Sequence, residues 1–132
     1  MTRLYRLPGK PKRQDYTGRP ARAVLDELKA EAAFQAEIER AAALKGWLTW
    51  HDRDSRKNER GLPDLVMVYP GDAATPGRLV FAELKREGEE PTEEQRQWLA
   101  ALATVPGITV RLWRPSDFDE IERVLTRRGE QR

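Results

Sequence analysis

Two carboxylates and a lysine stand out because of where they fall between apolar segments. Asp64 follows Pro63 and opens an apolar, β-branched run, and Glu83 and Lys85 close the next such run. Side chains alternate along a strand, so Glu83 and Lys85 share one face at its end. Carboxylates that meet at neighbouring strand ends can hold Mg²⁺, and a nearby lysine can stabilise negative charge that develops on a phosphate. The pattern therefore indicates metal-assisted hydrolysis of a phosphodiester.

Each of these features also has an ordinary explanation. An aspartate after a proline often makes a turn, and a Glu-x-Lys sequence on a strand is often a solvated pair. However, Leu79 and Phe81 place Glu83 and Lys85 on an apolar face, where charged groups need partners. The combination therefore favours a site over two unrelated surface features.

A third carboxylate belongs to an amphipathic helix predicted for residues 21–45, which are rich in good helix formers. The apolar stripe of this helix consists of Val24, Leu28, Ile38 and Ala42. Glu31 falls at the centre of that stripe, where a carboxylate is costly unless it meets a cation or a metal ion. We therefore expect either that Glu31 joins the acidic cluster, or that a helix break near residues 29–32 lets it reach water.

The remaining sequence supplies the elements that must position these residues. Strands are predicted at residues 47–52, 64–69, 79–85 and 108–113. Two further helices are predicted, one at residues 92–104 that opens with a capping box of Thr92 and Gln95, and one that Ser116 caps. Tight turns favour antiparallel pairing of the first strands, and the helical crossover before residue 108 favours a parallel pair. The expected fold is α/β, a mixed β-sheet flanked by helices in the order α-β-β-β-α-β-α.

Composition excludes several other kinds of chemistry. The 132 residues include no cysteine and one histidine, His51, which rules out disulfides, thiolate zinc sites and sites that need two imidazoles. No glycine-rich loop for a nucleotide cofactor occurs. Apolar stretches fall short of the ~18 residues of a membrane span, and the N-terminus has no apolar signal region. We therefore expect a cytoplasmic protein, or one of the host cytoplasm if the chain is viral, with no membrane partner.

Charge is divided unevenly along the chain. Residues 1–22 carry seven cations and one anion, whereas the other 110 residues carry 17 positive and 21 negative charges. We interpret residues 1–20 as a basic arm, residues 21–128 as a single domain and residues 129–132 as a frayed end. The arm is either a solubilising tail or a segment that binds phosphates or a partner subunit.

Taken together, these segments resemble the VRR-NUC branch of the PD-(D/E)XK nucleases. The string GLPDLVMVYPG supplies the PD element as Pro63 and Asp64, and RLVFAELKREG supplies the ExK element as Glu83, Leu84 and Lys85. The similarity covers roughly residues 31–125. It also includes Glu31, the pair Gly46-Trp47, the Gln95-x-x-Trp98 element and the string WRPSDFDEIERVL. The resemblance implies a restriction-endonuclease-like core.

The resemblance also implies a nuclease that cuts phosphodiester bonds in DNA with Mg²⁺ or Mn²⁺. Asp64, Glu83 and the backbone carbonyl of Leu84 would bind the metal ion. Glu31 would complete the acidic cluster directly or through water, and Lys85 would position the attacking water. Gln95 would take part in catalysis, although it also suits the third position of a capping box.

Small stand-alone members of this family are similar to Holliday-junction resolvases and act on branched DNA as homodimers, which implies the same substrate and assembly for this chain. The alternatives are a flap, splayed-arm or single-strand nuclease, and a non-catalytic DNA-binding module that keeps the fold.

A polar group before Asp64 is a candidate for contacts with the DNA backbone. It consists of His51, Arg53, Ser55, Arg56 and Lys57. The ordinary alternative is a structural histidine followed by a solvated loop. The four tryptophans, Trp47, Trp50, Trp98 and Trp113, are interpreted as core or interface residues.

Overall fold

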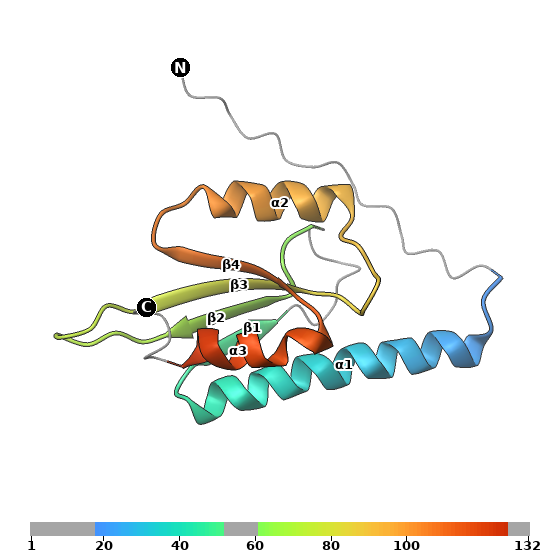
Figure 1. Cartoon of the computed structure of the whole chain (residues 1–132), viewed down its shortest axis with the longest axis horizontal. Helices are drawn as coiled ribbons and strands as arrows, with labels where there is room; N and C mark the ends of the chain where they lie inside the picture. The colour runs from blue at the N-terminus through green and yellow to red at the C-terminus, as the bar shows by residue number, and fades with distance from the viewer. Residues whose placement is uncertain (1–17, 52–60, 127–132) are drawn as a thin grey trace, which may run out of the picture.

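The computed structural model describes residues 18–51 and 61–126, which form one four-stranded sheet with helices on both faces (Figure 1). In chain order the elements are α1 (Ala21–Leu44), β1 (Leu48–His51), β2 (Leu65–Tyr69), β3 (Arg78–Leu84), α2 (Glu93–Ala103), β4 (Ile108–Trp113), the 3₁₀ helix η1 (Pro115–Asp117) and α3 (Phe118–Leu125). This order confirms the predicted α/β arrangement. None of the described helices has both the length and the apolar character needed to cross a bilayer.

The strands follow one another across the sheet in the order β1-β2-β3-β4. The first two pairs are antiparallel and the β3–β4 pair is parallel, as predicted. Helix α2 makes the crossover that a parallel pair requires. The ladder continues past β3, because the Lys85 amide donates a hydrogen bond to the Trp113 carbonyl at 2.9 Å. The backbone of residues 83–85 is therefore held by its pairing with β4.

The face of the sheet toward α1 and α3 carries the hydrophobic core. Leu65 pairs with Ala82 and Met67 with Val80, and all four side chains are fully buried. The two helices contribute Phe34, Ile38, Ala42, Ile121 and Leu125. The opposite face of the sheet is the one that α2 covers (Figure 1).

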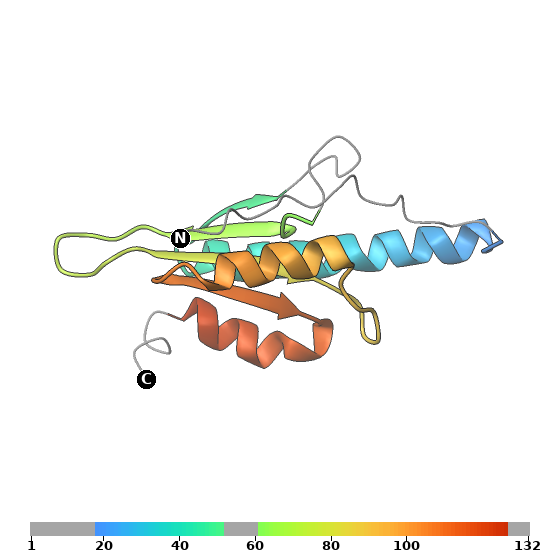
Figure 2. The same ribbon diagram turned by 90° about the horizontal axis from the view of Figure 1, so that it is seen from above.

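Helix α1 is continuous over 24 residues, so the alternative of a helix break near residues 29–32 is wrong. Its C-terminal half packs on the sheet through three buried side chains, those of Phe34, Ile38 and Ala42. Its N-terminal half extends past the sheet (Figures 1 and 2), and Leu25 and Leu28 are 55% and 45% exposed. The apolar stripe is therefore covered along only part of its length, which lets Glu31 stay near water without a break in the helix.

The turn from β4 into α3 also differs from the sequence prediction. Asp117, not Ser116, is the N-cap residue of α3, and the Asp117 carboxylate accepts a hydrogen bond from the Arg114 amide at 2.8 Å. Ser116 donates hydrogen bonds from its amide and its hydroxyl to Glu87, at 2.9 and 3.0 Å. Ser116 therefore ties the start of α3 to the connection between β3 and α2, a contact that local sequence does not reveal.

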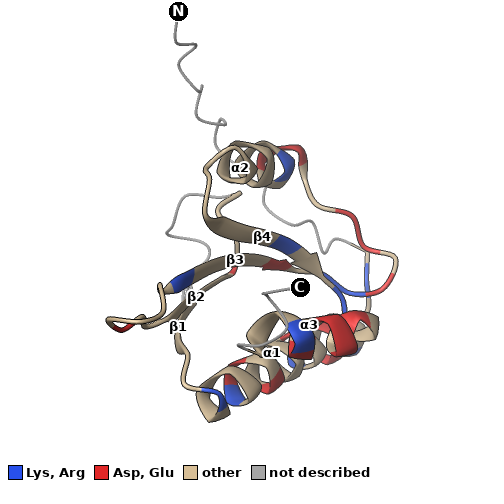
Figure 3. Cartoon of the chain, turned by 60° about the vertical axis from the view of Figure 1, so that its left-hand side comes forward, with Lys and Arg blue, Asp and Glu red and all other residues tan. Residues whose placement is uncertain are grey.

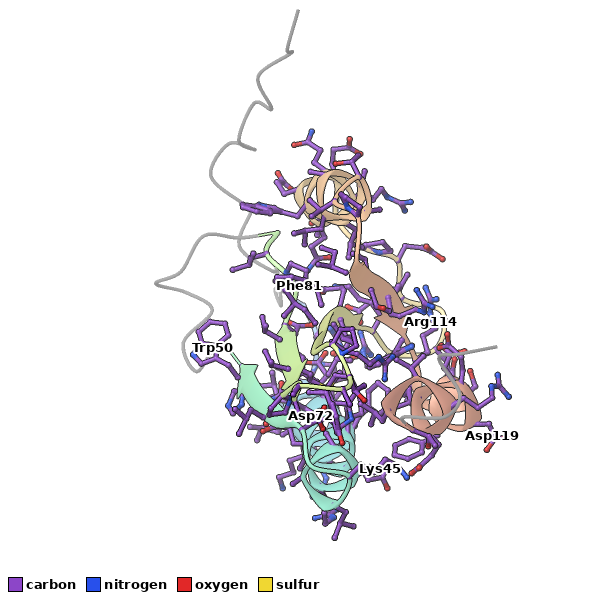
Figure 4. The ribbon with its side chains drawn as sticks, turned by 90° about the vertical axis from the view of Figure 1, so that its left-hand side faces the viewer. Lys45, Trp50, Asp72, Phe81, Arg114 and Asp119 are labelled. Atoms are coloured by element: carbon purple, nitrogen blue, oxygen red, sulfur yellow. The ribbon has the colours of Figure 1, made fainter. Side chains whose placement is uncertain are left out.

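The tryptophans divide between core and surface. Trp47 and Trp113 are buried, whereas Trp50 is 52% exposed and projects outward from β1 (Figure 4). The Trp47 indole donates a hydrogen bond to the Leu125 carbonyl at 2.8 Å, and the Arg78 guanidinium lies 4.9 Å from the centre of the Trp47 ring. Trp47 therefore joins the segment before β1 to the end of α3.

Trp47→Phe should destabilise the protein by about 1–3 kcal/mol, because the Leu125 carbonyl would be left buried without its donor. Urea unfolding measures this loss. Trp50→Phe is the matched control and should change the free energy of unfolding by less than about 0.5 kcal/mol. Equal losses in the two variants would contradict the role assigned to the indole hydrogen bond.

Candidate active site

Asp64 and Glu83 face each other across the β2–β3 pair. Leu65 pairs with Ala82, so the preceding Asp64 lies opposite Glu83, on the sheet face that α2 covers. The Leu84 amide donates a hydrogen bond to Asp64 Oδ2 at 3.0 Å. This bond fixes the Asp64 carboxylate against β3, beside the backbone of the ExK element.

Glu83 is the one buried charged residue among those that the structure describes, with 1% of it exposed. Lys85 Nζ lies 3.3 Å from Glu83 Oε2, and the lysine side chain is only 10% exposed. The contact between these two side chains is an ion pair rather than a well-directed hydrogen bond. Burial, reinforced by the charge of Asp64, raises the pKa of Glu83 from 4.5 to about 9, against the opposing effect of Lys85.

These groups fit a hard divalent cation. The buried carboxylate oxygens of Glu83, beside the second carboxylate of Asp64, are ligands of the kind that Mg²⁺ and Mn²⁺ prefer. Within residues 18–51 and 61–126, however, no three acidic or histidine side chains come close enough together to hold a metal ion by themselves. Asp64 and Glu83 would therefore need other oxygens, such as the predicted Leu84 carbonyl, water or a phosphate.

Glu31 lies at the margin of this group. Its side chain is 41% exposed, and its Oε1 lies 3.7 Å from Arg86 Nε. Burial and the charge of Glu89 raise the pKa of Glu31, as does Asp64, whereas Arg86 and Lys85 oppose the rise. The charges of Asp64 and Lys85 therefore act on the Glu31 carboxylate, although Glu31 does not form a three-carboxylate cluster with Asp64 and Glu83.

His51 contacts α1. Its Nδ1 lies 3.3 Å from Glu39 Oε1, and Gln35 Nε2 donates a hydrogen bond to the same oxygen at 2.9 Å. Because His51 pairs with Leu65 in the β1–β2 register, it lies one residue away from the Asp64 position. The other predicted backbone contacts, Arg53, Ser55, Arg56 and Lys57, lie outside the described residues.

Gln95 occupies the capping box that the sequence predicts. Its side-chain oxygen accepts a hydrogen bond from the Thr92 amide at 2.8 Å, and its own amide donates to Thr92 Oγ1 at 3.2 Å. The cap therefore accounts for the side-chain oxygen of Gln95 at the start of α2. A catalytic role for this residue stays a prediction.

Gly61 is a positioning residue that the sequence analysis did not single out. Its φ is +92°, and a Cβ atom there would lie 2.7 Å from both the Glu94 carbonyl oxygen and Trp98 Cδ1. The chain can therefore pass this close to α2 only with glycine, three residues before Asp64. The signal in the sequence is the glycine of the GLPD string.

The connection between β3 and α2 carries a second group of contacts near the site, which the sequence analysis did not single out. Acidic and basic residues crowd this part of the molecule (Figure 3). Within the connection, Arg86 pairs with carboxylates of α1, and the Arg114 side chain donates a hydrogen bond to the Glu89 carbonyl at 2.6 Å. These partners are distant in sequence, so periodicity carries no signal for them.

The family model of the VRR-NUC domain matches residues 12–114. The chain therefore belongs to the VRR-NUC family, a family of nucleases that act on DNA, and this confirms the predicted family. Its mixed sheet flanked by helices is consistent with a restriction-endonuclease-like fold. No curated protein and no solved structure matches the chain significantly.

Gly61→Ala should destabilise the protein by more than about 1 kcal/mol, because alanine is strained at positive φ and its Cβ would also meet the α2 backbone. Gly88→Ala is the matched control, since Gly88 has φ +79° and nothing within 4 Å of the Cβ position. Urea unfolding of both variants separates the two effects. A loss no larger in Gly61→Ala than in Gly88→Ala would contradict the close approach to α2.

The metal-free protein should lose stability as the pH rises from about 5 to 9. The folded chain keeps a proton on Glu83 until pH 9, whereas the unfolded chain releases it near pH 4.5. The unfolded state therefore binds fewer protons, and the free energy of unfolding falls by up to about 1.4 kcal/mol per pH unit.

Glu83→Gln should flatten this dependence, and Glu37→Gln, a change at an exposed position of α1, should not. Urea unfolding in the presence of a chelator, repeated at pH 5, 7 and 9, tests the prediction. The same pH dependence in Glu83→Gln as in the unaltered protein would refute it.

Proposed function

We propose that this chain is a metal-dependent, structure-selective DNA endonuclease that hydrolyses phosphodiester bonds in branched DNA, with Holliday junctions as the preferred substrate. The observation that carries the proposal is the Glu83 carboxylate, which is buried, lies opposite Asp64 and has the Lys85 ammonium 3.3 Å away. Such a carboxylate is costly in a purely structural role, and a bound cation would offset that cost. Membership of a nuclease family supports the same reading.

Mg²⁺ or Mn²⁺, when bound, would polarise the scissile phosphate and lower the pKa of a water molecule. Asp64, Glu83 and the Leu84 carbonyl would hold the ion, and Glu31 would complete the site directly or through water. The Leu84 amide already fixes Asp64 at 3.0 Å, so one ligand is oriented before any ion arrives.

Lys85 would act on the water and on the phosphate. The β3–β4 ladder holds its backbone, and its ammonium lies beside Glu83. From there it can donate to the attacking water and stabilise negative charge that develops on the phosphate oxygens. The raised pKa of Glu83 adds a second consequence, because the site must release the Glu83 proton when a cation binds.

Selectivity for branched DNA rests on shape and assembly. Contacts with the phosphate backbone position a protein without reading the sequence, and the geometry of the DNA then provides the selectivity. Two symmetric cuts across a four-way junction require two sites related by a two-fold axis. We therefore propose a homodimer, with His51 and the segment that follows it in contact with the backbone.

The test is cleavage of labelled four-way junctions, flaps, splayed arms, single strands and duplexes with Mg²⁺, with Mn²⁺ or with a chelator. The junction should be cut fastest, and the chelator should stop cutting. Glu83→Gln, Asp64→Asn and Lys85→Met should each lower the single-turnover rate by roughly 10²-fold or more, because each removes a group aimed at the reacting centre. Glu37→Gln, with its exposed side chain, is the control and should cut normally.

Three results would overturn parts of the proposal. A protein that leaves every DNA intact with both metal ions is not a nuclease, and one that cuts in the chelator is not metal-dependent. Equal cutting of duplexes and junctions would remove the structural selectivity. A flap, splayed-arm or single-strand preference would replace the junction as substrate, and a monomeric mass in analytical ultracentrifugation would refute the dimer.

A further inference from the structure

Arg86 follows Lys85 in the chain. Its side chain forms ion pairs both with α1 and with the segment that joins β3 to α2. Its Nη1 lies 2.7 Å from Glu27 Oε1, and its Nε lies 3.7 Å from both Glu31 Oε1 and Glu89 Oε1. Glu27 and Glu31 are one turn apart on α1, whereas Glu89 belongs to the connection. One guanidinium therefore gathers three carboxylates from two elements.

Both the backbone and the guanidinium of Arg86 have fixed partners. Glu27, its closest partner, is also paired with Arg19. The Arg86 amide donates a hydrogen bond to Glu89 Oε1 at 3.2 Å, and the Glu89 amide donates to the Arg86 carbonyl at 3.1 Å. The position of Arg86 is thus set by α1 on one side and by the turn of the connection on the other.

The contact of Arg86 with Glu31 is longer than its contact with Glu27, at 3.7 Å against 2.7 Å. Arg86 Nε is buried and donates no hydrogen bond within the described residues, although two carboxylate oxygens lie at ion-pair distance. Arginine keeps its charge at every accessible pH. Arg86 therefore attracts the Glu31 carboxylate toward the site without locking its orientation by a hydrogen bond.

Glu31 lies where solvent can draw its carboxylate away from the site, so an attraction from Arg86 can affect its position. Its helix extends past the sheet, and its side chain is 41% exposed, so water competes with the site for this carboxylate. Burial and the charges of Glu89 and Asp64 raise the pKa of Glu31, whereas Arg86 and Lys85 lower it. Of these two cations, Arg86 is the one that an ion pair joins to Glu31.

We propose that Arg86 is a positioning residue for Glu31, which holds this carboxylate beside Asp64 and Lys85 and leaves it free to turn toward a cation bound there. This inference rests on the proposed function. Its consequence is that Arg86 promotes metal binding even though it adds a positive charge near the site.

A double-mutant cycle of Arg86→Gln, Glu31→Gln and the combined variant tests the inference. Mn²⁺ affinity is measured by calorimetry on the full chain without DNA, and cleavage is measured on the DNA that the unaltered protein cuts best. Each single change should weaken Mn²⁺ binding by roughly 10-fold, as expected for loss of a group that supports a metal site. The combined variant should be no weaker than Glu31→Gln, because Arg86 acts through Glu31.

Arg114→Gln is the matched control. The Arg114 side chain also holds the β3–α2 connection, through the Glu89 carbonyl at 2.6 Å, and its 23% exposed side chain pairs with Glu90 rather than with Glu31. It should leave the Mn²⁺ affinity unchanged. Arg86→Lys keeps the charge and should recover part of the affinity. Arg86→Met, which also removes the charge, replaces Arg86→Gln in the cycle if circular dichroism shows that Arg86→Gln is unfolded.

The outcomes separate this inference from the proposed function. If the unaltered protein neither binds Mn²⁺ nor cuts DNA, the proposed function fails. If it does both, but Arg86→Gln behaves like Arg114→Gln, only the inference fails. An increase of Mn²⁺ affinity in Arg86→Gln would show that Arg86 competes with the ion for Glu31, and additive losses in the combined variant would show that Arg86 acts elsewhere. Either result overturns the assignment.

Discussion

The placement of a carboxylate inside the sheet, opposite a second one, is the constraint around which this molecule is arranged. Glu83 is buried beside Asp64, with the Lys85 ammonium as its nearby countercharge. An isolated ionised carboxylate is strongly disfavoured in such surroundings. Burial therefore raises the pKa of Glu83 to about 9, so the carboxyl of the metal-free protein keeps its proton at neutral pH.

The elements around the site each fix one part of it. The parallel β3–β4 ladder holds the ExK backbone, the Leu84 amide orients Asp64, and α2 leaves room for the PD segment only because residue 61 is glycine. Helix α1 then brings Glu31 from the opposite side. The proposed chemistry would therefore depend on residues from three separate stretches of the chain, and family membership alone would not show how they are held.

Local patterns predicted the parts of this structure that local forces decide. The Thr92–Gln95 capping box and the strand Ile108–Trp113 could be predicted from sequence, because a helix cap and a run of strand-forming residues need no distant partner. Patterns could also predict that Asp64 and Glu83 come from adjacent strands. They failed for the continuity of α1 and for Ser116, because tertiary packing decides how much of a helix is covered and which group accepts a serine hydroxyl. The partners of Arg86 on α1 were beyond reach for the same reason.

The two faces of the sheet differ in how firmly they are covered. Helices α1 and α3 bury side chains such as Ile38 and Ile121 against it, whereas none of the described residues of α2, Glu93–Ala103, is buried. Lifting α2 would therefore uncover no fully buried side chain of that helix, whereas displacing α1 or α3 would expose side chains of the core. Asp64 and Glu83 thus lie on the sheet face whose covering helix contributes no fully buried side chain.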